Sequence, residues 1–363
     1  MLVAALIVAA VTFATCAHAG DGAIPPESVT ESPALVTARP LPTPAPSPPP
    51  TEAAPTPYGG LVNPLTGLPV AEDIAKNRPY AIMYNNRKIA QPLLGISKAD
   101  VIYEAPVEGG ITRMLAIFQD VSDVGVIGSV RSARPYYIDL AQGYDAIYIH
   151  AGGSPQAYQL LQARNVTRLD GVNGSRQDIF FRDAARRSAM GYEHSLVTSG
   201  ALISQYLPTY GFRLEHEDGY GYAPKFEPDA VAPGTEPGER VQIMFSSIKS
   251  TTLEYGADDG LYSLGQFDKK VEDGDGARVL VANVLILRTA VGQISGDTEG
   301  RLTVTLTGSG AGYFYCGGKR AEIRWSKKDA ASPFVYTLED GTALTFRTGR
   351  TYVAIISKTA EAL

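Results

Sequence analysis

Cysteine is almost absent from this chain of 363 residues, which contains only Cys16 and Cys316. Because Cys16 lies in an N-terminal segment with the features of an export signal, the remainder has one thiol and cannot form an internal disulfide framework. Cys316 has no histidine near it in the sequence to act as a base, and two glycines follow it. We therefore expect Cys316 to be a small buried residue beside a turn and not a nucleophile.

Histidine is equally scarce, and no two histidines have the i, i+4 spacing of a metal-binding helix. The four positions are His18, His150, His194 and His216. The acidic run at residues 272–276 lacks the length and ligand series of a calcium loop and indicates a turn. The sequence also lacks G-x-S-x-G, Walker A and G-x-G-x-x-G motifs. We predict no metal and no cofactor, and leave open a magnesium ion held by Glu104, Glu108 or Asp178 beside a bound phosphate.

A surplus of positive charge is missing as well, since the formal net charge is −6 and the pI about 5.4. Proteins that bind nucleic acid usually carry a basic face, so we expect no nucleic-acid partner. The uncharged apolar run at residues 2–14 is too short to span a membrane and fits the apolar region of a signal peptide.

Two processing signals overlap after this run, and we assign residues 1–19 to the export segment. Ala17-His18-Ala19 fits a cleavage site before Gly20, whereas Phe13-Ala14-Thr15-Cys16 resembles a lipobox in which Cys16 is acylated. The chain is therefore expected to be exported. It is either lipid-anchored through Cys16 at the outer face of the cytoplasmic membrane or secreted.

The remaining chain divides by composition into four parts. Residues 20–60 include the proline-rich stretch 38–57, which cannot bury a core and predicts a disordered, extended tether. Residues 61–208 alternate short apolar runs with helical patterns and form the first predicted domain. Residues 209–238, rich in Gly, Pro and Tyr, are the predicted linker, and residues 239–363 form the second predicted domain.

The first domain has the order of an α/β fold, a mixed sheet with helices. Its predicted strands are residues 80–84, 101–105, 114–118, 124–130 and 146–150. Predicted helices begin at Pro135, Pro155 and His194. The second domain is expected to be smaller and mostly antiparallel β, because short β-rich runs are separated by turn pairs. The turn pairs Gly317-Gly318 and Asp340-Gly341 are expected to close hairpins.

Two successive strand–loop–helix units carry the most informative residues. In the first, an apolar run ending at Val130 opens onto Arg131-Ser132-Ala133-Arg134, and in the second the run ending at Ile149 opens onto residues 150–154. Helix N-termini expose unpaired N–H groups, and ligands of open α/β sheets bind at the carboxyl ends of strands. The units therefore predict an anion site. The alternative is that both arginines pair internally with carboxylates.

Further polar residues extend this candidate site. The predicted ligand-binding residues are Arg113, Arg131, Arg134, Gly152, Gly153, Ser154, Asp178, Arg182 and His194. The candidate catalytic residues are Glu104, Glu108 and His150. For residues 178–183 the alternative is a solvated turn with local ion pairs, and for His194 it is a capping role at the start of a helix.

Several stretches together resemble the YerB-like family of bacterial lipoproteins, a two-part domain of unknown function. They are "NPLTGLP", "RPYAIMYNN", "ADVIYEAPVEGGITRMLAIFQD", "IGSVRSARPYYIDLA", "YDAIYIHAGGSPQA" and "ANVLILRT". The resemblance covers roughly residues 63–357, and the block at residues 131–136 is its most specific part. It implies a cell-surface location and lipid anchoring at Cys16. It implies no reaction.

We therefore expect a protein of the cell envelope that binds an anionic ligand, bearing phosphate or carboxylate, through the α/β domain. One alternative is an enzyme acting on a phosphodiester or glycosyl bond of an envelope polymer, as a phosphotransferase or hydrolase. The layout also resembles, at the level of element order alone, the LytR–CpsA–Psr phosphotransferases. A second alternative is a structural lipoprotein. The expected partners are an envelope polymer, its precursor or another envelope protein.

Overall fold

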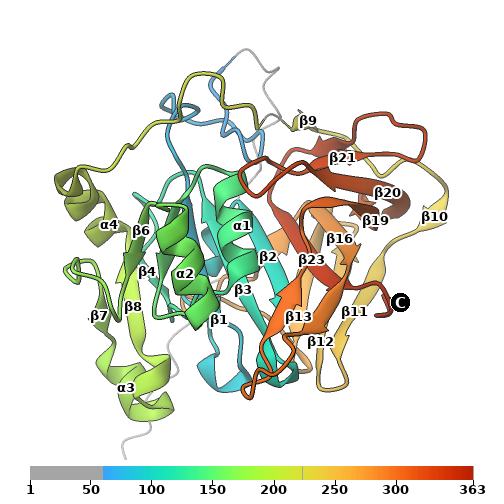
Figure 1. The fold of residues 1–363 in the computed structure, drawn as a ribbon. Coiled ribbons are helices and arrows are strands. Elements are labelled where there is room, and N and C mark those ends of the chain that lie inside the picture. Colours follow the sequence, from blue (N-terminus) through green and yellow to red (C-terminus); the bar gives the residue numbers. More distant parts are fainter. Residues whose placement is uncertain (1–59, 223, 363) are drawn as a thin grey trace, which may run out of the picture. The chain divides into compact units, whose positions relative to one another are not determined.

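A computed structural model describes residues 60–222 and 224–362. The predicted export segment, Cys16 and nearly all of the predicted tether lie outside the described residues. The described part is built around an eleven-stranded sheet in the order β10-β20-β19-β16-β23-β2-β3-β1-β5-β6, with β21 paired to β20 (Figure 1). In chain order its strands are β1 (Tyr80–Asn85), β2 (Val101–Pro106), β3 (Thr112–Phe118), β5 (Ile147–His150), β6 (Arg168–Asp170), β10 (Glu236–Pro237), β16 (Asn283–Thr289), β19 (Gly308–Cys316), β20 (Lys319–Lys327), β21 (Val335–Thr337) and β23 (Thr351–Ser357).

Smaller sheets and helices surround this central sheet. A five-stranded sheet contains β11 (Arg240–Ser246), β12 (Lys249–Gly256), β13 (Leu261–Gln266), β14 (Lys269–Lys270) and β15 (Leu280–Val281). A three-stranded sheet contains β4 (Val126–Gly128), β7 (Phe181–Arg182) and β8 (Leu196–Ser199). Two further pairs are β9 (Lys225–Glu227) with β22 (Thr345–Arg347) and β17 (Val291–Gln293) with β18 (Leu302–Val304). The α-helices are α1 (Pro135–Gly143), α2 (Pro155–Ala163), α3 (Ala184–Met190) and α4 (Gly200–Tyr206).

The N-terminal part is a mixed sheet with few helices, as its sequence predicted. Strand β3 pairs antiparallel with β1 and β2, whereas β1, β5 and β6 run parallel. Helices α1 and α2 both begin at the predicted proline, where the missing N–H costs no intrahelical bond. Figure 1 shows the two helices side by side across one face of the sheet.

Two predicted elements differ in the structure. The strand expected at residues 124–130 is shortened to β4, which leaves the central sheet and pairs with β8. The helix expected from His194 is wrong, because His194 ends the short 3-10 helix η4 (Tyr192–His194) and β8 follows it. Pairing with β4 and β7 overrides the helical pattern there. The α-helix begins only at Gly200, where the Ser199 hydroxyl accepts a hydrogen bond from Leu202 N–H.

The C-terminal part consists mostly of antiparallel strands, as predicted. Gly317 and Gly318, both at positive φ, close the hairpin of β19 and β20. Two strands are exceptions: β23 lies parallel to β16 on one side and to β2 on the other, and β22 lies parallel to β9. The strands of both parts therefore share one sheet. The stretch predicted as a linker contains β9, which pairs with β22, and β10, which pairs with β20.

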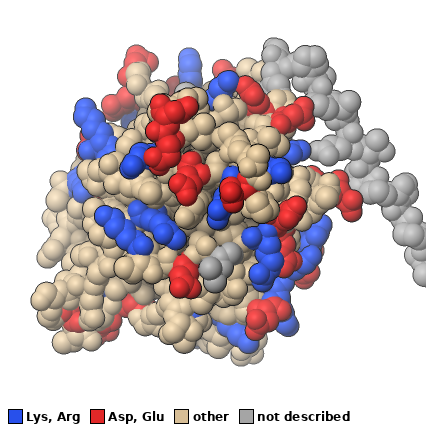
Figure 2. All heavy atoms as spheres, turned by 90° about the vertical axis from the view of Figure 1, so that its right-hand side faces the viewer, with Lys and Arg blue, Asp and Glu red and all other residues tan. Residues whose placement is uncertain are grey.

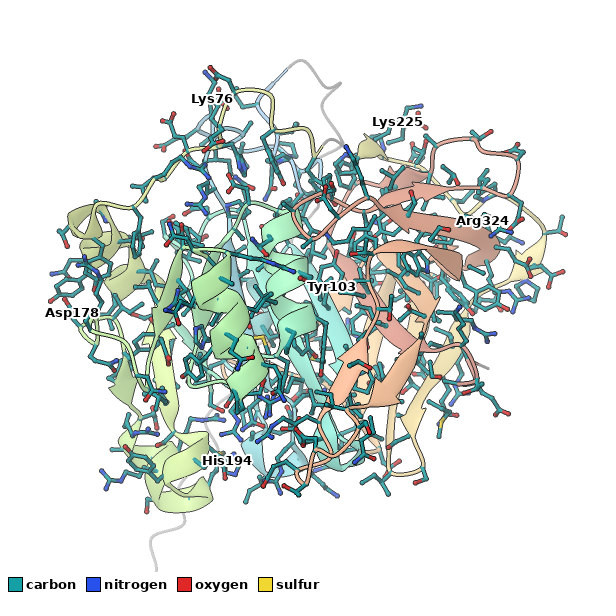
Figure 3. The ribbon with its side chains drawn as sticks, viewed as in Figure 1. Lys76, Tyr103, Asp178, His194, Lys225 and Arg324 are labelled. Carbon is teal, nitrogen blue, oxygen red and sulfur yellow. The ribbon has the colours of Figure 1, made fainter. Side chains whose placement is uncertain are left out.

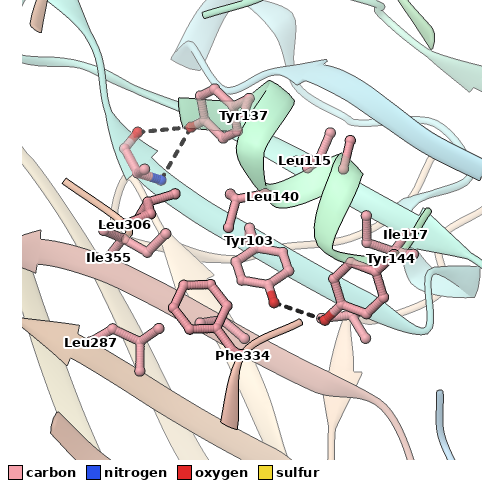
Figure 4. Packing of buried hydrophobic residues seen from close by; sticks show 14 of the residues in the cluster. Tyr103, Leu115, Ile117, Tyr137, Leu140, Tyr144, Leu287, Leu306, Phe334 and Ile355 are labelled. Carbon is pink, nitrogen blue, oxygen red and sulfur yellow. Dashed lines mark hydrogen bonds between the residues drawn. The ribbon is translucent and has the colours of Figure 1, made fainter. Parts of the chain in front are cut away.

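The alternation of strand residues places an apolar core on each face of the central sheet. On the face under α1 and α2, Tyr103 donates or accepts a hydrogen bond with Tyr144 over 2.7 Å, and the Tyr137 hydroxyl donates to the carbonyl of Ala105 (Figure 4). On the opposite face, Ile102 and Ile286 belong to the same core as residues of the five-stranded sheet. Cys316 is fully buried, as expected, and burial raises the pKa of its thiol to about 11.

Charges of both signs are mixed on the surface. Figure 2 shows acidic and basic side chains interspersed over the face that it presents, without a broad area of one sign. No helix of the described residues is long and apolar enough to cross a membrane.

Candidate functional site

The two strand–loop–helix units lie against each other at the N-terminal ends of α1 and α2. Ala151 N–H donates to the carbonyl of Arg131 over 2.9 Å, and Ala133 N–H donates to that of Gly152 over 2.9 Å. The Ser154 hydroxyl caps α2 by accepting a hydrogen bond from Ala157 N–H. These backbone bonds hold the arginine-bearing loop beside the second loop, as the shared pattern predicted.

Arg113 and Arg134 share one carboxylate. Arg134 donates from Nε to Oε2 of Glu108 over 3.0 Å and also pairs with Oε1 through Nη2. Arg113 donates from Nη2 to Oε1 of Glu108 over 3.3 Å and from Nη1 to the carbonyl of Ser132 over 3.0 Å. Both arginines are 6% exposed. Two guanidinium groups therefore meet a single carboxylate, which leaves one formal positive charge in excess.

Arg131 lies on the outer side of this pair and contacts the segment that contains His194. It pairs with the carboxylate of Glu193, which is exposed, and donates to the Glu193 carbonyl over 3.1 Å. The adjacent His194 is buried, and its Nδ1 accepts a hydrogen bond from Asn85 Nδ2 over 2.7 Å. Asn85 in turn faces Arg113 across β1 and β3.

The pKa values of neighbouring groups indicate a positive potential here. Burial and the charges of Arg134 and Arg131 lower the pKa of Arg113 to about 10. Burial and the charges of Arg131 and Arg87 also lower the pKa of His194, against the opposing charge of Glu193. We call Arg87, Arg113, Arg131 and Arg134 the arginine rim. With Glu108 and Glu193 as its only ion-pair partners among the described residues, it carries two formal positive charges in excess.

Two buried polar groups near the arginine rim have no hydrogen-bond partner among the described residues. They are the Tyr148 hydroxyl and Nε2 of His150, and both side chains are fully buried on β5. Because His150 Nδ1 lies 2.8 Å from the Gly152 carbonyl, Nδ1 carries the proton and Nε2 is left as an acceptor. Burial lowers the pKa of His150, although Asp170 opposes the shift, so the ring is neutral at pH 7. An unpaired buried polar group is costly, which makes these two atoms candidates for contact with a ligand or water.

Two of the three backbone amides predicted as donors in the glycine loop already donate within the protein. Gly152 N–H donates to Oδ1 of Asp170 over 2.8 Å, and Ser154 N–H donates to the carbonyl of Ala133. Both amides therefore have internal acceptors. Gly153 has a packing role, because a Cβ atom there would lie 3.3 Å from the Tyr158 ring.

Glu104 lies on the other face of the sheet from the arginine rim. In β2 and β3, Ala105 pairs with Arg113, whereas Glu104 pairs with Met114, so Arg113 and Glu104 point to opposite faces. Glu104 is 0% exposed, and its two oxygens accept five hydrogen bonds. The donors are Asn86, Thr112, Thr251, Gln266 and Tyr352. The structure thus separates Glu104 from the candidate anion site.

Asp178 and Arg182 make contacts of their own. Asp178 lies beside Tyr210, and burial together with the Asp178 charge raises the pKa of Tyr210 to about 12. Arg182 donates to the Tyr192 carbonyl over 2.6 Å, and its guanidinium carbon lies 3.4 Å from the centre of the Tyr192 ring. Figure 3 shows Asp178 well apart from His194. Of the predicted ligand-binding residues outside the two units, the structure brings Arg113 and His194 to the arginine rim, while Asp178 lies elsewhere.

The sequence analysis missed three residues of this region: Asn85, Arg87 and Glu193. Asn85 and Arg87 follow the first predicted strand, and the end of a strand was the signal used for Arg131, so the same rule could have found them. Glu193 reaches the site through the loop before β8, which sequence spacing does not indicate. Among the described residues, no group of three or more His, Cys, Asp or Glu side chains could hold a metal ion.

Known proteins resemble this chain in sequence and in structure. The chain is 30% identical over 315 residues to a protein of Bacillus subtilis (strain 168) named "Putative lipoprotein YerB", a match that covers 84% of this chain and 89% of the relative. A solved structure titled "Crystal structure of YerB protein from Bacillus subtilis" superposes with a TM-score of 0.72 at 28% identity, covering 84% of this chain and 99% of the other.

The family comparison agrees with these relatives. Residues 65–213 match the family described as "Protein of unknown function (DUF3048) N-terminal domain", and residues 241–353 match the corresponding C-terminal domain. Both matches confirm the resemblance drawn from the quoted stretches. The chain belongs to the DUF3048 family, whose members have no assigned function.

Proposed function

We propose that this protein is exported, anchored to the outer face of the cytoplasmic membrane through Cys16, and binds an anionic envelope-associated ligand at the arginine rim. The location is supported by the apolar run at residues 2–14, by the lipobox-like sequence ending at Cys16 and by the name of the Bacillus relative. The ligand class is supported by the charges of the site.

The observation that carries the proposal is the excess of guanidinium groups over carboxylates at the N-terminal end of α1. Arg113 and Arg134 share Glu108, and Arg131 has only the exposed Glu193 as its carboxylate partner among the described residues. Arginine binds phosphate and carboxylate through two parallel hydrogen bonds. A ligand oxygen that replaces the exposed Glu193 carboxylate would find Arg131 already positioned by its bond to the Glu193 carbonyl.

The two carboxylates considered for catalysis favour binding over turnover. Burial alone would raise the pKa of Glu108, but the hydrogen bond from Arg134 and the charge of Arg113 outweigh it and lower the pKa. An ionised Glu108 held by two arginines is a poor general acid. Glu104 is enclosed on the other sheet face by five internal donors and faces no ligand.

The test is calorimetric titration of the exported part with pyrophosphate and with citrate, which represent phosphate and carboxylate ligands. The Arg131→Gln variant is expected to bind about tenfold more weakly than the wild type, because it loses one charged bidentate contact. Arg164→Gln is the matched control. Arg164 lies at the C-terminal end of α2 and pairs with Asp139 over 2.6 Å. The Arg164→Gln variant therefore removes the same charge at a position away from the arginine rim.

Equal affinity of the wild type and Arg131→Gln for both probes would refute the arginine rim as the anion site. Retention of a protein partner by Arg131→Gln, with no anion bound by the wild type, would support the structural lipoprotein instead.

Anchoring is tested separately. The Cys16→Ser variant is expected to move from the membrane fraction to the soluble fraction, and an unchanged distribution would refute acylation at Cys16.

A further inference from the structure

A polar groove lies on the five-stranded sheet, separate from the arginine rim. It has a volume of about 780 Å³, within the range of small-ligand sites. Its floor is the outward face of β11, β12 and β13, whose inward face packs on the core of the central sheet. Because strand residues alternate, the floor carries hydroxyl and amide side chains, namely Gln242, Ser250, Thr252 and Ser263. We call this the hydroxyl groove.

Three residues that line the hydroxyl groove each carry a buried polar atom that makes no hydrogen bond within the described residues. The Ser263 hydroxyl and Oε1 of Gln266 are buried and have no hydrogen-bond partner in the part of the chain that the structure describes. Nζ of Lys249, also buried, makes no hydrogen bond and lies 4.4 Å from the centre of the Phe267 ring. The side chains of Lys249 and Gln266 point to the inward side, where both contact Glu104, so the Ser263 hydroxyl is the unpaired atom on the groove floor.

The charge of the hydroxyl groove is positive at one end. Five basic and two acidic residues line it: Lys88, Arg240, Lys249, Lys269, Lys270, Glu254 and Asp268. Arg240 pairs with Glu254 and Lys249 with Glu104. The other three lysines are exposed and have no ion-pair partner among residues 60–222 and 224–362. They gather around the turn between β13 and β14, where Phe267 also lies.

A peptide that adds a strand to this sheet is disfavoured. The edge strand β11 is already paired in part by the chain's own C-terminal residues, with Met244 N–H donating to the carbonyl of Glu361 and a bridge between Ile243 and Ala362. A ligand must therefore be recognised by side chains and not by the backbone of that edge. Hydroxyl and amide groups along a flat strand surface both donate and accept hydrogen bonds, which suits the hydroxyl groups of sugars.

We infer that the hydroxyl groove binds an acidic oligosaccharide. Its hydroxyl groups would bond Gln242, Ser250 and Ser263, and its carboxylates would lie against Lys269 and Lys270. The ring of Phe267 would pack on the apolar face of a sugar unit. This site is separate from the arginine rim and does not depend on the function proposed for it.

The test is titration of the protein with hexagalacturonate, the neutral maltohexaose and hexaglutamate. Binding of hexagalacturonate at least tenfold tighter than binding of either control is expected. The double variant Lys269→Ala/Lys270→Ala should lower the affinity for hexagalacturonate at least tenfold, and Ser263→Ala should lower it severalfold. The variant Lys328→Ala/Lys358→Ala removes the same charge from exposed positions elsewhere and should leave affinity unchanged.

The outcomes are distinct. Equal affinity for hexaglutamate would show that charge alone is recognised and would overturn the inference, as would unchanged binding by Lys269→Ala/Lys270→Ala or no binding of hexagalacturonate. Repeating the titration in the Arg131→Gln variant separates the two sites. Binding of hexagalacturonate to Arg131→Gln with the wild-type affinity supports the hydroxyl groove, whether or not the arginine rim binds anions. Loss of this binding in Arg131→Gln overturns the inference.

Discussion

Nζ of Lys249 lies 3.4 Å from Oε1 of Glu104, and both side chains are buried between the central sheet and the five-stranded sheet. Glu104 belongs to β2, near the start of the described chain, and Lys249 begins β12 in the C-terminal part. Burial lowers the pKa of Lys249, and the charge of Glu104 opposes that shift. This contact joins the two parts that the sequence suggested as separate domains.

Removing Glu104 should destabilise the protein more than removing Lys249. Glu104→Gln leaves the Lys249 ammonium without a carboxylate, and it replaces a carboxylate oxygen that only accepts hydrogen bonds by an amide group that also donates. We therefore expect the free energy of unfolding to fall by about 3 kcal/mol. Lys249→Met removes an ammonium that makes no hydrogen bond, while Glu104 keeps its five donors. We expect a loss of about 1 kcal/mol. Guanidinium unfolding followed by circular dichroism measures both.

The double variant Glu104→Gln/Lys249→Met completes this cycle. It should lose less stability than the sum of the two single variants, because the neutral amide no longer faces a buried charge. Simple additivity would mean that the two side chains do not interact.

Asp145 should make stability depend on pH in the acid range. It accepts two hydrogen bonds from Arg213, over 2.7 and 2.8 Å, and one from His216 over 3.0 Å. Burial would raise its pKa, but these contacts and the charge of Arg78 lower it to about 2. The pKa of Asp145 in the folded protein lies below its unfolded value of about 3.8. The stabilisation that the ionised Asp145 provides is therefore complete above about pH 4 and disappears as pH falls toward about 2.

The Asp145→Asn variant should accordingly be about 1–2 kcal/mol less stable than the wild type at pH 7, after allowance for solvent screening. The difference should shrink as pH falls from 4 to 2. Thermal unfolding at a series of pH values measures it. A difference that stays constant across this range would contradict the assignment of the low pKa to Asp145.

Gly200 should be intolerant of any side chain. A Cβ atom there would lie 1.8 Å from the carbonyl oxygen of Val121 and 2.4 Å from that of Val124. Since backbone must shift to accept it, Gly200→Ala is expected to cost about 3 kcal/mol or more. Gly125→Ala is the control, because no atom lies within 4 Å of the corresponding Cβ and the residue is exposed. That variant should stay within about 0.5 kcal/mol of the wild type, and equal losses would refute the steric argument.

Local signals predicted much of the N-terminal fold. Pro135 and Pro155 mark the starts of α1 and α2, and the runs at residues 80–84 and 101–105 lie within β1 and β2. The helix expected at His194 was wrong because residues 196–199 pair with β4, which is distant in the sequence, and with β7. A helical pattern and a short strand look alike when the pairing partner is unknown.

The candidate site was predicted in part. The gathering of Arg131 and Arg134 with Arg113 follows from strand ends and loop positions, which can be read along the chain. The partner Glu193 could not be predicted, since its contact with Arg131 depends on the path of the loop before β8. Nor did the pattern at Glu104 indicate that alternation would turn its carboxylate away from Arg113.

The amino-acid sequence alone determined where α1 and α2 begin, where β1 and β2 run and which segment resembles an export signal. These properties depend on neighbours within a few positions, such as a proline at the first turn or alternation along a strand. The tertiary structure decided that β23 lies between β16 and β2, that Lys249 meets Glu104 and that the hydroxyl groove forms. Each of these requires segments distant in the chain to pair, and that pairing follows from the packing of the whole sheet.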